Sequence, residues 1–252
     1  MNKMSEKKIY SRNEFEELRK TWAQEMADDI PLNQEALDVF VKAYKHNWIH
    51  QSNWCGEPVL QLPQDMFALQ EIIFATRPNF IIEIGVAWGG SLLFYATLQE
   101  VIGGDLVIGV DIFIPDDLRE RLNSHSLLSK RIKLIEGSSL DNSVIEKIKE
   151  IVGTDKKIMV ILDSHHTHEH VIQELNKYSP FCGEGQYIIV SDTFIDRFPP
   201  QTHRPRPWGP NNNPKTAVEE FLKTHPEFVV DAEIDRKLLF TCNPSGYIKH
   251  IS

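Results

Sequence analysis

The chain has little of what marks an exported, membrane-spanning or nucleic-acid-binding protein. Its 252 residues include three scattered cysteines without a CxxC pair, so neither a disulfide framework nor a cysteine zinc site is expected. No apolar run approaches the ~20 residues of a membrane span, and residues 1–8 are charged, unlike a secretory leader. Lys and Arg number 27 against 36 Asp and Glu, and this net charge of −9 counts against a nucleic-acid backbone as the main partner. These absences predict a cytoplasmic protein with reduced thiols at Cys55, Cys182 and Cys242.

The length fits one α/β domain with a modest extension. We expect a helical N-terminal extension over residues 1–60 and the main domain over 61–252. Apolar residues recur near the 3.6-residue period of a helix at 14–27, 34–48 and 66–76. The first two helices are expected to be separated at Asp29-Ile30-Pro31, and the stretch 51–65 to be irregular with Trp54 exposed.

Beyond residue 77 the pattern alternates between strand and helix. Short apolar runs predict strands at 80–84, 106–110, 132–135, 158–162, 187–190, 228–230 and 237–241. Helices are expected at 91–101, at 142–152 and at 214–224, and a further helix is expected to follow the strand at 158–162 and to end at Tyr178. This alternation predicts a Rossmann-like α/β fold, with a seven-stranded, mostly parallel sheet covered by helices on both faces.

Acidic residues stand at or beside the carboxyl ends of four expected strands. They are Glu83, Asp111, Asp163 and Asp192. Because ligands of open parallel sheets bind outside these strand ends, we expect the functional site there.

The segment Phe80-Ile81-Ile82-Glu83-Ile84-Gly85-Val86-Ala87-Trp88-Gly89-Gly90-Ser91 is typical of an α/β nucleoside-cofactor loop, with a strand, a turn and a helix N-terminus. Ala87 stands where the dinucleotide pattern G-x-G-x-x-G needs a glycine, and the absence of a following Lys-Ser/Thr counts against a phosphate-binding P-loop. The carboxylate of Glu83 would repel a diphosphate but could receive, through water, the ammonium group of S-adenosylmethionine. A structural turn with a solvated acid is the alternative.

Two further segments fit an adenosine group. Asp111 lies 21 residues beyond Gly90, where an acid accepts hydrogen bonds from both ribose hydroxyls. Ser138 and Ser139, which follow the third strand, could address the exocyclic amine of an adenine together with Asp141. The alternative for this second segment is an N-cap of the next helix.

The densest titratable cluster is Asp163-Ser164-His165-His166-Thr167-His168-Glu169-His170. Asp163 and Asp192 end neighbouring strands and could share one hard divalent ion such as Mg²⁺. His166 and His170, four residues apart, are expected on one helix face, with His166 favoured as the general base. The alternatives are a solvated helix start capped by Ser164, or a zinc site built from the histidines.

The Pro- and Asn-rich segment from Arg204 to Pro214 follows the second of these aspartates. A stiff loop carrying Trp208 suits a substrate wall or lid over the strand ends. A surface connection in which Asn213-Pro214 starts a helix is the alternative.

Taken together, the motifs resemble the cephalosporin hydroxylase family, whose better-understood members are similar to S-adenosylmethionine-dependent O-methyltransferases, including rhamnosyl O-methyltransferases. The resemblance runs from about residue 54 to 251. Its motifs are Gln61-x-Pro63-x-Asp65, Arg77-Pro78, the glycine loop, Asp163-Ser164, His166-Thr167, His170-Val171, Asp192-Thr193, Gly209-Pro210 and Asn212-Asn213-Pro214.

The resemblance implies a class I methyltransferase fold with S-adenosylmethionine at the glycine loop and Mg²⁺ on Asp163 and Asp192. In the antibiotic-pathway relative the residue before the second aspartate is an acid that joins the metal site. Here that residue is Ser191, so the third metal ligand is open.

These observations predict an O-methyltransferase acting on a hydroxyl of a sugar, glycan or small secondary metabolite. The expected cofactor-binding residues are Glu83, Gly85, Ala87, Trp88, Gly89, Ser91, Asp111, Ser138, Ser139 and Asp163. The metal is expected on Asp163, Asp192 and Ser191, with Asp163, His166 and His170 as catalytic residues. An Fe(II)-dependent hydroxylase and a non-catalytic binding protein are the alternatives. A homo-oligomer is expected, and the N-terminal helices are predicted to cover the site or to form a subunit contact.

Overall fold

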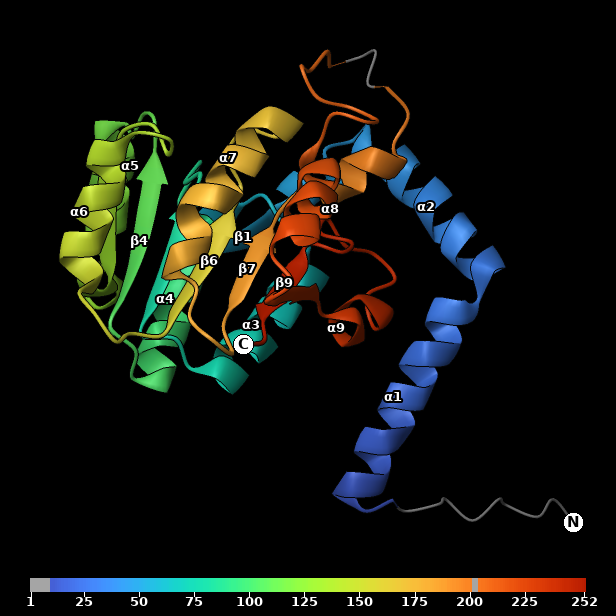
Figure 1. The fold of residues 1–252 in the computed structure, drawn as a ribbon. Coiled ribbons are helices and arrows are strands. Elements are labelled where there is room, and N and C mark those ends of the chain that lie inside the picture. Colours follow the sequence, from blue (N-terminus) through green and yellow to red (C-terminus); the bar gives the residue numbers. More distant parts are fainter. Residues whose placement is uncertain (1–9, 201–203) are drawn as a thin grey trace, which may run out of the picture.

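The computed structural model describes residues 10–200 and 204–252 (Figure 1). The charged segment 1–8, which the sequence predicts not to be a secretory leader, lies outside these residues. Within the described ranges, none of the helices combines the length and apolar character needed to cross a membrane.

The core is a seven-stranded sheet in the order β5-β4-β3-β6-β7-β9-β8, which confirms the predicted fold. Its parallel strands are β3 (Phe80–Ile84), β4 (Leu106–Asp111), β5 (Ile132–Glu136), β6 (Ile158–Leu162) and β7 (Tyr187–Val190). The last strand, β9 (Tyr247–His250), runs antiparallel between β7 and β8 (Phe228–Val230). All five parallel strands therefore end at one edge of the sheet.

The strand predicted at 237–241 is wrong, because the chain there follows the short helix α9 (Ala232–Arg236) and makes turns. Its apolar side chains do not share one sheet face. Leu238 packs on the main core, whereas Phe240 packs into a separate aromatic cluster. The second strand of the final pair is β9 instead.

Helices cover both faces of the sheet, as Figure 1 shows. One face packs against α3 (Pro63–Thr76), α4 (Gly90–Ile102) and α5 (Asp116–Ser124). The opposite face packs against α6 (Asn142–Val152), α7 (His168–Tyr178) and α8 (Pro214–Thr224). The sequence did not predict α5, because only Leu118 and Leu122 in this mainly charged segment are buried.

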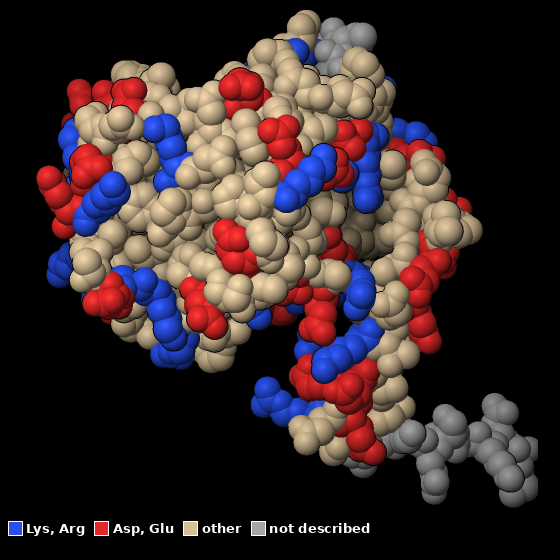
Figure 2. Space-filling view, in the orientation of Figure 1, with Lys and Arg blue, Asp and Glu red and all other residues tan. Residues whose placement is uncertain are grey.

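The N-terminal extension begins with α1 (Arg12–Asp28) and α2 (Ile30–Tyr44), and α1 projects from the body (Figure 1). Pro31 lies in the first turn of α2, where a proline is tolerated, so the second helix starts four residues earlier than predicted. Phe40 of α2 packs on Phe194 and Phe198 and fixes the helix to the body. Figure 2 shows acidic and basic side chains interspersed over this face of the molecule.

The segment predicted to be irregular contains a hairpin of β1 (Ser52–Trp54) and β2 (Glu57–Val59). Its turn residues Cys55 and Gly56 both have positive φ, the conformation of a tight hairpin turn. Trp54 is not exposed as expected, since its ring packs on Phe94 with centroids 5.0 Å apart and its indole N–H donates to Thr97. The three cysteines are free, in agreement with the predicted thiols.

Candidate active site

The candidate site lies where the strand order reverses. From β3 the chain moves outward through β4 to β5, and then returns to place β6 on the other side of β3. Loops that leave the carboxyl ends of two such strands diverge and open a crevice between them.

Two pockets open at this point and share the lining residues Gly85, Ala87, Asp163 and Ser164. The β4-side pocket, with a volume of about 380 Å³, is also lined by Asp111, Ile112, Ser138, Ser139, His165 and His170. The β7-side pocket, of about 280 Å³, is also lined by Tyr44, His50, Asp192, Arg204, Arg206 and Trp208. The geometry therefore offers two binding spaces that meet at the ends of β3 and β6.

The glycine loop is shaped by its contacts with the chain as well as by its open side. Gly85 has φ +96°, and a Cβ there would lie 2.1 Å from the carbonyl oxygen of Asp163. A Cβ on Gly90 would lie 2.3 Å from the carbonyl oxygen of Pro58, so this glycine lets the β1–β2 hairpin sit on α4. The Asp111 carboxylate accepts hydrogen bonds from the amides of Val86 at 2.8 Å and Ala87 at 3.4 Å. Asp111 therefore fixes the glycine loop, and its predicted role in binding the ribose hydroxyls stays a prediction.

Glu83 lies beneath this loop and is almost completely buried. Burial raises the pKa of its carboxyl well above the ordinary value, opposed by a hydrogen bond with Ser91. Its Oε2 atom has no hydrogen-bond partner among the described residues. Glu83 lines neither pocket, so its unpaired oxygen could reach a bound ligand only through water.

Ser138 and Ser139 line the β4-side pocket, and neither supplies the N-cap of α6, which is Asp141. The Ser139 hydroxyl donates to Glu174 Oε1 at 2.6 Å, and Ser164 donates to the same atom at the same distance. His170 Nε2 lies 3.0 Å from that oxygen. The buried Glu174 thus connects the loop after β5, the loop after β6 and α7.

The sequence interpretation missed Glu174, although its i, i+4 spacing from His170 was a usable signal. An acid within an amphipathic helix gives no other indication that it is buried.

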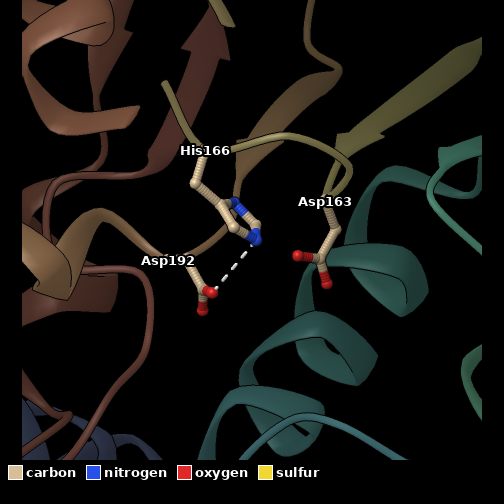
Figure 3. Close-up of side chains that lie close together, drawn as sticks. All are labelled: Asp163, His166 and Asp192. Atoms are coloured by element: carbon tan, nitrogen blue, oxygen red, sulfur yellow. Dashed lines mark ion pairs between the residues drawn. The ribbon is translucent and has the colours of Figure 1, made fainter. Parts of the chain in front are cut away.

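Asp163, His166 and Asp192 converge in the β7-side pocket, each with a ligand atom within 4.8 Å of the others (Figure 3). His166 Nε2 lies 3.3 Å from Asp192 Oδ2, and their side chains are 13% and 22% exposed. Burial, and then the charge of Asp192, raises the pKa of Asp163 to about 7. Burial, and then the charge of Asp65, raises that of Asp192 to about 7. Burial lowers the pKa of His166, which favours the neutral imidazole.

The two carboxylates in this arrangement fit a hard divalent cation, and the neutral imidazole lies beside them. Gln61, buried on the same wall, hydrogen-bonds Asp163 and orients it. The predicted third ligand, Ser191, has a buried Oγ without a partner in the described part of the chain.

His166 and His170 do not share a helix face, contrary to the expectation. The helix α7 begins at His168 after the N-cap Thr167, so His166 precedes it and Ser164 does not cap it. His166 faces the β7-side pocket, whereas His170 lines the β4-side pocket. His165 lies beside His170, with ring centroids 5.1 Å apart, whereas His168 is bound to Thr216 and Glu220 of α8. The group of three possible metal ligands found among the described residues contains one histidine, His166, which counts against a zinc site made of histidines.

The loop from Arg204 to Pro214 serves both of the roles considered for it. Trp208 packs edge to face on His166, with ring centroids 4.9 Å apart, and forms a wall of the β7-side pocket. Asn213 caps α8 with a reciprocal capping box through Thr216. The helix cap thus anchors one end of the pocket wall.

The sheet order and the strand-end crevice define a class I methyltransferase fold. A family model described as Rhamnosyl O-methyltransferase/CmcI matches residues 46–251, and the chain belongs to this family. The resemblance drawn from the sequence motifs is thereby confirmed.

Curated relatives and solved structures agree with this assignment. Rhamnosyl O-methyltransferases of Mycobacterium tuberculosis and Mycobacterium leprae are 28% and 29% identical to the chain, over 81% and 82% of its length and 82% and 87% of theirs. A structure of CmcI with Mg and SAM has a TM-score of 0.56 at 20% identity, covering 81% of this chain and 78% of that one. An apo structure of CmcI has a TM-score of 0.55 at 22% identity, covering 81% and 77%. At these identities the solved structures support the fold.

Proposed function

We propose that the protein is an S-adenosylmethionine- and Mg²⁺-dependent O-methyltransferase that acts on a hydroxyl of a sugar, a glycan or a small secondary metabolite. The observation that carries this proposal is the pair of pockets that meet at Gly85–Ala87 and Asp163–Ser164. A group-transfer enzyme needs two substrates in contact, and these pockets provide adjoining spaces for a donor and an acceptor. The names of the curated relatives, rhamnosyl O-methyltransferases, support a sugar acceptor.

We assign the methyl donor to the β4-side pocket. Asp111, Ser138 and Ser139 supply hydroxyl and carboxylate groups for the adenosine part, and Gly85 and Ala87 supply the loop backbone. Of the other loop residues predicted to bind the donor, Trp88 and Ser91 line the β7-side pocket and Gly89 lines neither pocket. His170 belongs to this half of the site through its contact with Glu174. Glu83, with its unpaired buried oxygen, fits the predicted water-mediated contact to the donor ammonium.

We assign the acceptor and the metal to the β7-side pocket. Asp163 and Asp192 would hold Mg²⁺. Ser191 lines neither pocket, but its buried, unpaired hydroxyl lies next to Asp192 in the chain and is proposed as a neutral third donor. A bound Mg²⁺ would lower the pKa of an acceptor hydroxyl. His166 accepts the hydroxyl proton at Nε2, the acceptor oxygen forms its bond to the methyl carbon, and the bond from that carbon to sulfur breaks. S-adenosylhomocysteine and the methyl ether are the products.

The donor set also separates this proposal from an Fe(II)-dependent hydroxylase. The iron triad of such enzymes combines two histidines with one carboxylate. The converging group here has one histidine and two carboxylates, and His170 faces the other pocket. The observed set therefore favours a hard ion and methyl transfer.

The N-terminal extension over residues 1–60 contributes to the acceptor side of the site. Tyr44, Ile49, His50 and Pro58 from this part of the chain line the β7-side pocket. This supports the predicted covering role and the proposed division from the main domain at residue 60.

We further propose that the protein acts in the cytoplasm as a homo-oligomer. The free thiols suit a reducing compartment. Helix α1 contains no buried residue, and its Phe15 and Trp22 are 45% and 47% exposed. A groove separates α1 from the body, and Glu16, Arg19 and Lys20 line its α1 side. At 3.6 residues per turn, the two aromatic side chains lie about a quarter turn of the helix away from this groove. We propose a second copy of the chain on this side of α1.

Light scattering tests the assembly. We expect an oligomer for the wild type and a lower mass for Trp22→Glu, with Thr21→Glu as the matched control on the same helix. A monomeric wild type would contradict the assembly.

Transfer of a labelled methyl group tests the function. The purified protein is incubated with labelled S-adenosylmethionine, Mg²⁺ and a panel of monosaccharides and methyl glycosides. We expect label in at least one sugar, loss of transfer in chelator, and loss of transfer in Asp163→Asn. Binding of S-adenosylhomocysteine by calorimetry should persist in that variant. Tight binding of oxoglutarate in place of S-adenosylhomocysteine would favour the hydroxylase, and donor binding without any transfer would favour the non-catalytic alternative.

A further inference from the structure

The β7-side pocket contains more positive charge than transfer to a neutral sugar requires. Arg204 and Arg206 both line it, on the segment that carries Trp208. Within the described residues neither guanidinium forms an ion pair, although the charge of Arg204 opposes the raised pKa of Asp192. The guanidinium of Arg206 lies 5.2 Å from the centre of the Trp208 ring, which holds it at the pocket wall.

The charges of the pocket do not cancel once its proposed ligands are counted. Asp163 and Asp192 together contribute two negative charges, which one divalent cation would offset. The sulfonium of the donor would add a positive charge beside them, and an ionised acceptor hydroxyl would offset that one. The two arginines then remain without a counter-charge. Guanidinium groups in this situation bind carboxylates and phosphates through paired hydrogen bonds.

The remaining lining fits the ring of a sugar. Tyr44, Trp88 and Trp208 present aromatic side chains to the pocket, and Trp88 is 54% exposed. Aromatic faces contact the apolar side of a ligand, and charged groups at the rim orient it. His50, whose pKa is lowered by burial and then by Arg204, adds a neutral hydrogen-bonding group on the same wall.

We propose that the acceptor is a sugar that carries an anionic substituent, a carboxylate or a phosphate, which Arg204 and Arg206 bind. This inference rests on the proposed function, because it names the substrate class of the same pocket. Arg204 and Arg206 are then specificity-determining residues, and the metal-side residues Asp163, His166 and Asp192 act on the hydroxyl.

Binding is measured on the full-length protein with Mg²⁺ and S-adenosylhomocysteine, so that no turnover is needed. The probes are glucuronic acid, glucose 1-phosphate and methyl α-D-glucopyranoside, titrated by ligand-observed NMR. We expect at least one anionic probe to bind tenfold or more tightly than the neutral glucoside. This preference should fall as salt is raised, because exposed ion pairs are screened. A preference for the uronic acid alone identifies a carboxylate, and a preference for the sugar phosphate alone identifies a phosphate.

The variant Arg204→Gln/Arg206→Gln should lose the preference while it retains the affinity for S-adenosylhomocysteine. Arg236→Gln, a change at the end of α9 away from both pockets, is the matched control and should keep it. Equal or absent binding of all three probes to the wild type contradicts the inference, as does a preference that survives the double variant. Failure of S-adenosylhomocysteine to bind at all would instead count against the proposed function.

Discussion

The two halves of the candidate site are built in different ways. The β4-side pocket uses the ends of consecutive strands, so Gly85, Asp111 and Ser138 follow one another in the chain as they do in space. The β7-side pocket combines such strand ends with Tyr44 and His50 of the extension and with the loop that carries Trp208. The first half is a property of the fold, and the second depends on segments that loops can vary. A family can therefore retain one donor while it changes acceptors.

Gly85 is the position at which both halves should fail together. In Gly85→Ala the new Cβ would meet the carbonyl oxygen of Asp163 at 2.1 Å, in a backbone conformation that side chains disfavour. We expect a loss of about 2–4 kcal/mol in the free energy of unfolding, with loss of both donor and metal binding. Urea denaturation and calorimetry measure these effects.

Gly103→Ala is the matched control, since Gly103 also has positive φ but no atom near its Cβ position. It should cost about 1 kcal/mol. Equal destabilisation of the two variants would mean that the contact with Asp163 is unimportant.

His166→Ala should impair the acceptor half alone. Loss of a general base reduces kcat by about 10²–10⁴-fold, and we expect the affinities for S-adenosylhomocysteine and Mg²⁺ to change little. His170→Ala should instead weaken donor binding, because His170 contacts Glu174 and the serines of the β4-side pocket. Kinetics and calorimetry on both variants measure the separation. If His166→Ala loses Mg²⁺ binding, His166 is a metal ligand and not the base.

Ser191→Asp should strengthen the metal site. A carboxylate in place of a neutral hydroxyl adds charge for a hard cation, and we expect Mg²⁺ affinity to rise about tenfold. Ser179→Asp, at a buried serine that is not next to Asp163 or Asp192 in the chain, is the control for buried charge. Unchanged or weaker Mg²⁺ binding in Ser191→Asp would remove Ser191 from the ligand set.

Without metal, the folded protein should become less stable as the pH rises from about 4 to about 7. Asp163 and Asp192 titrate near pH 7 in the folded chain, against an ordinary value of 3.8. Between these pH values the folded chain binds more protons than the unfolded chain, so its stability falls as the pH rises through this window. In chelator, we expect the Tm to decrease between pH 5.5 and pH 8. The decrease should be larger in the wild type than in Asp192→Asn, by on the order of 5 °C.

Added Mg²⁺ should raise the Tm of the wild type more at pH 8 than at pH 5.5, because it offsets the ionised carboxylates. Parallel Tm curves for wild type and variant would contradict the raised pKa of Asp192.

The parts of the fold that the sequence predicts well are those with a strong local period. The five parallel strands and the acids at their ends follow from short apolar runs, and their placement on one sheet edge follows from βα alternation. The β1–β2 hairpin was missed because its turn, Cys55-Gly56, lacks the usual Asn-Gly or Asp-Gly signal. The error at His166 and His170 came from extending a helix over residues that precede its N-cap.

The acceptor side could not be derived from local sequence. Tyr44 and Arg204 lie far apart in the chain, and only the packing of α2 on Phe194 and Phe198 brings their segments to one pocket. The predicted wall around Trp208 came from the position of its loop after β7, with no indication of what it faces. Tertiary contacts of this kind have no periodic signature.

The most direct test of the two-pocket site is calorimetric titration of S-adenosylhomocysteine and Mg²⁺ into Asp111→Asn and Asp192→Asn. We expect Asp111→Asn to lose most of the affinity for S-adenosylhomocysteine and to retain Mg²⁺. Asp192→Asn should lose Mg²⁺ and retain S-adenosylhomocysteine. Two results would contradict a donor half and a metal half that meet at β3 and β6. One is that both variants fold correctly but each loses both ligands, and the other is that one of the variants still binds both ligands with unchanged affinity.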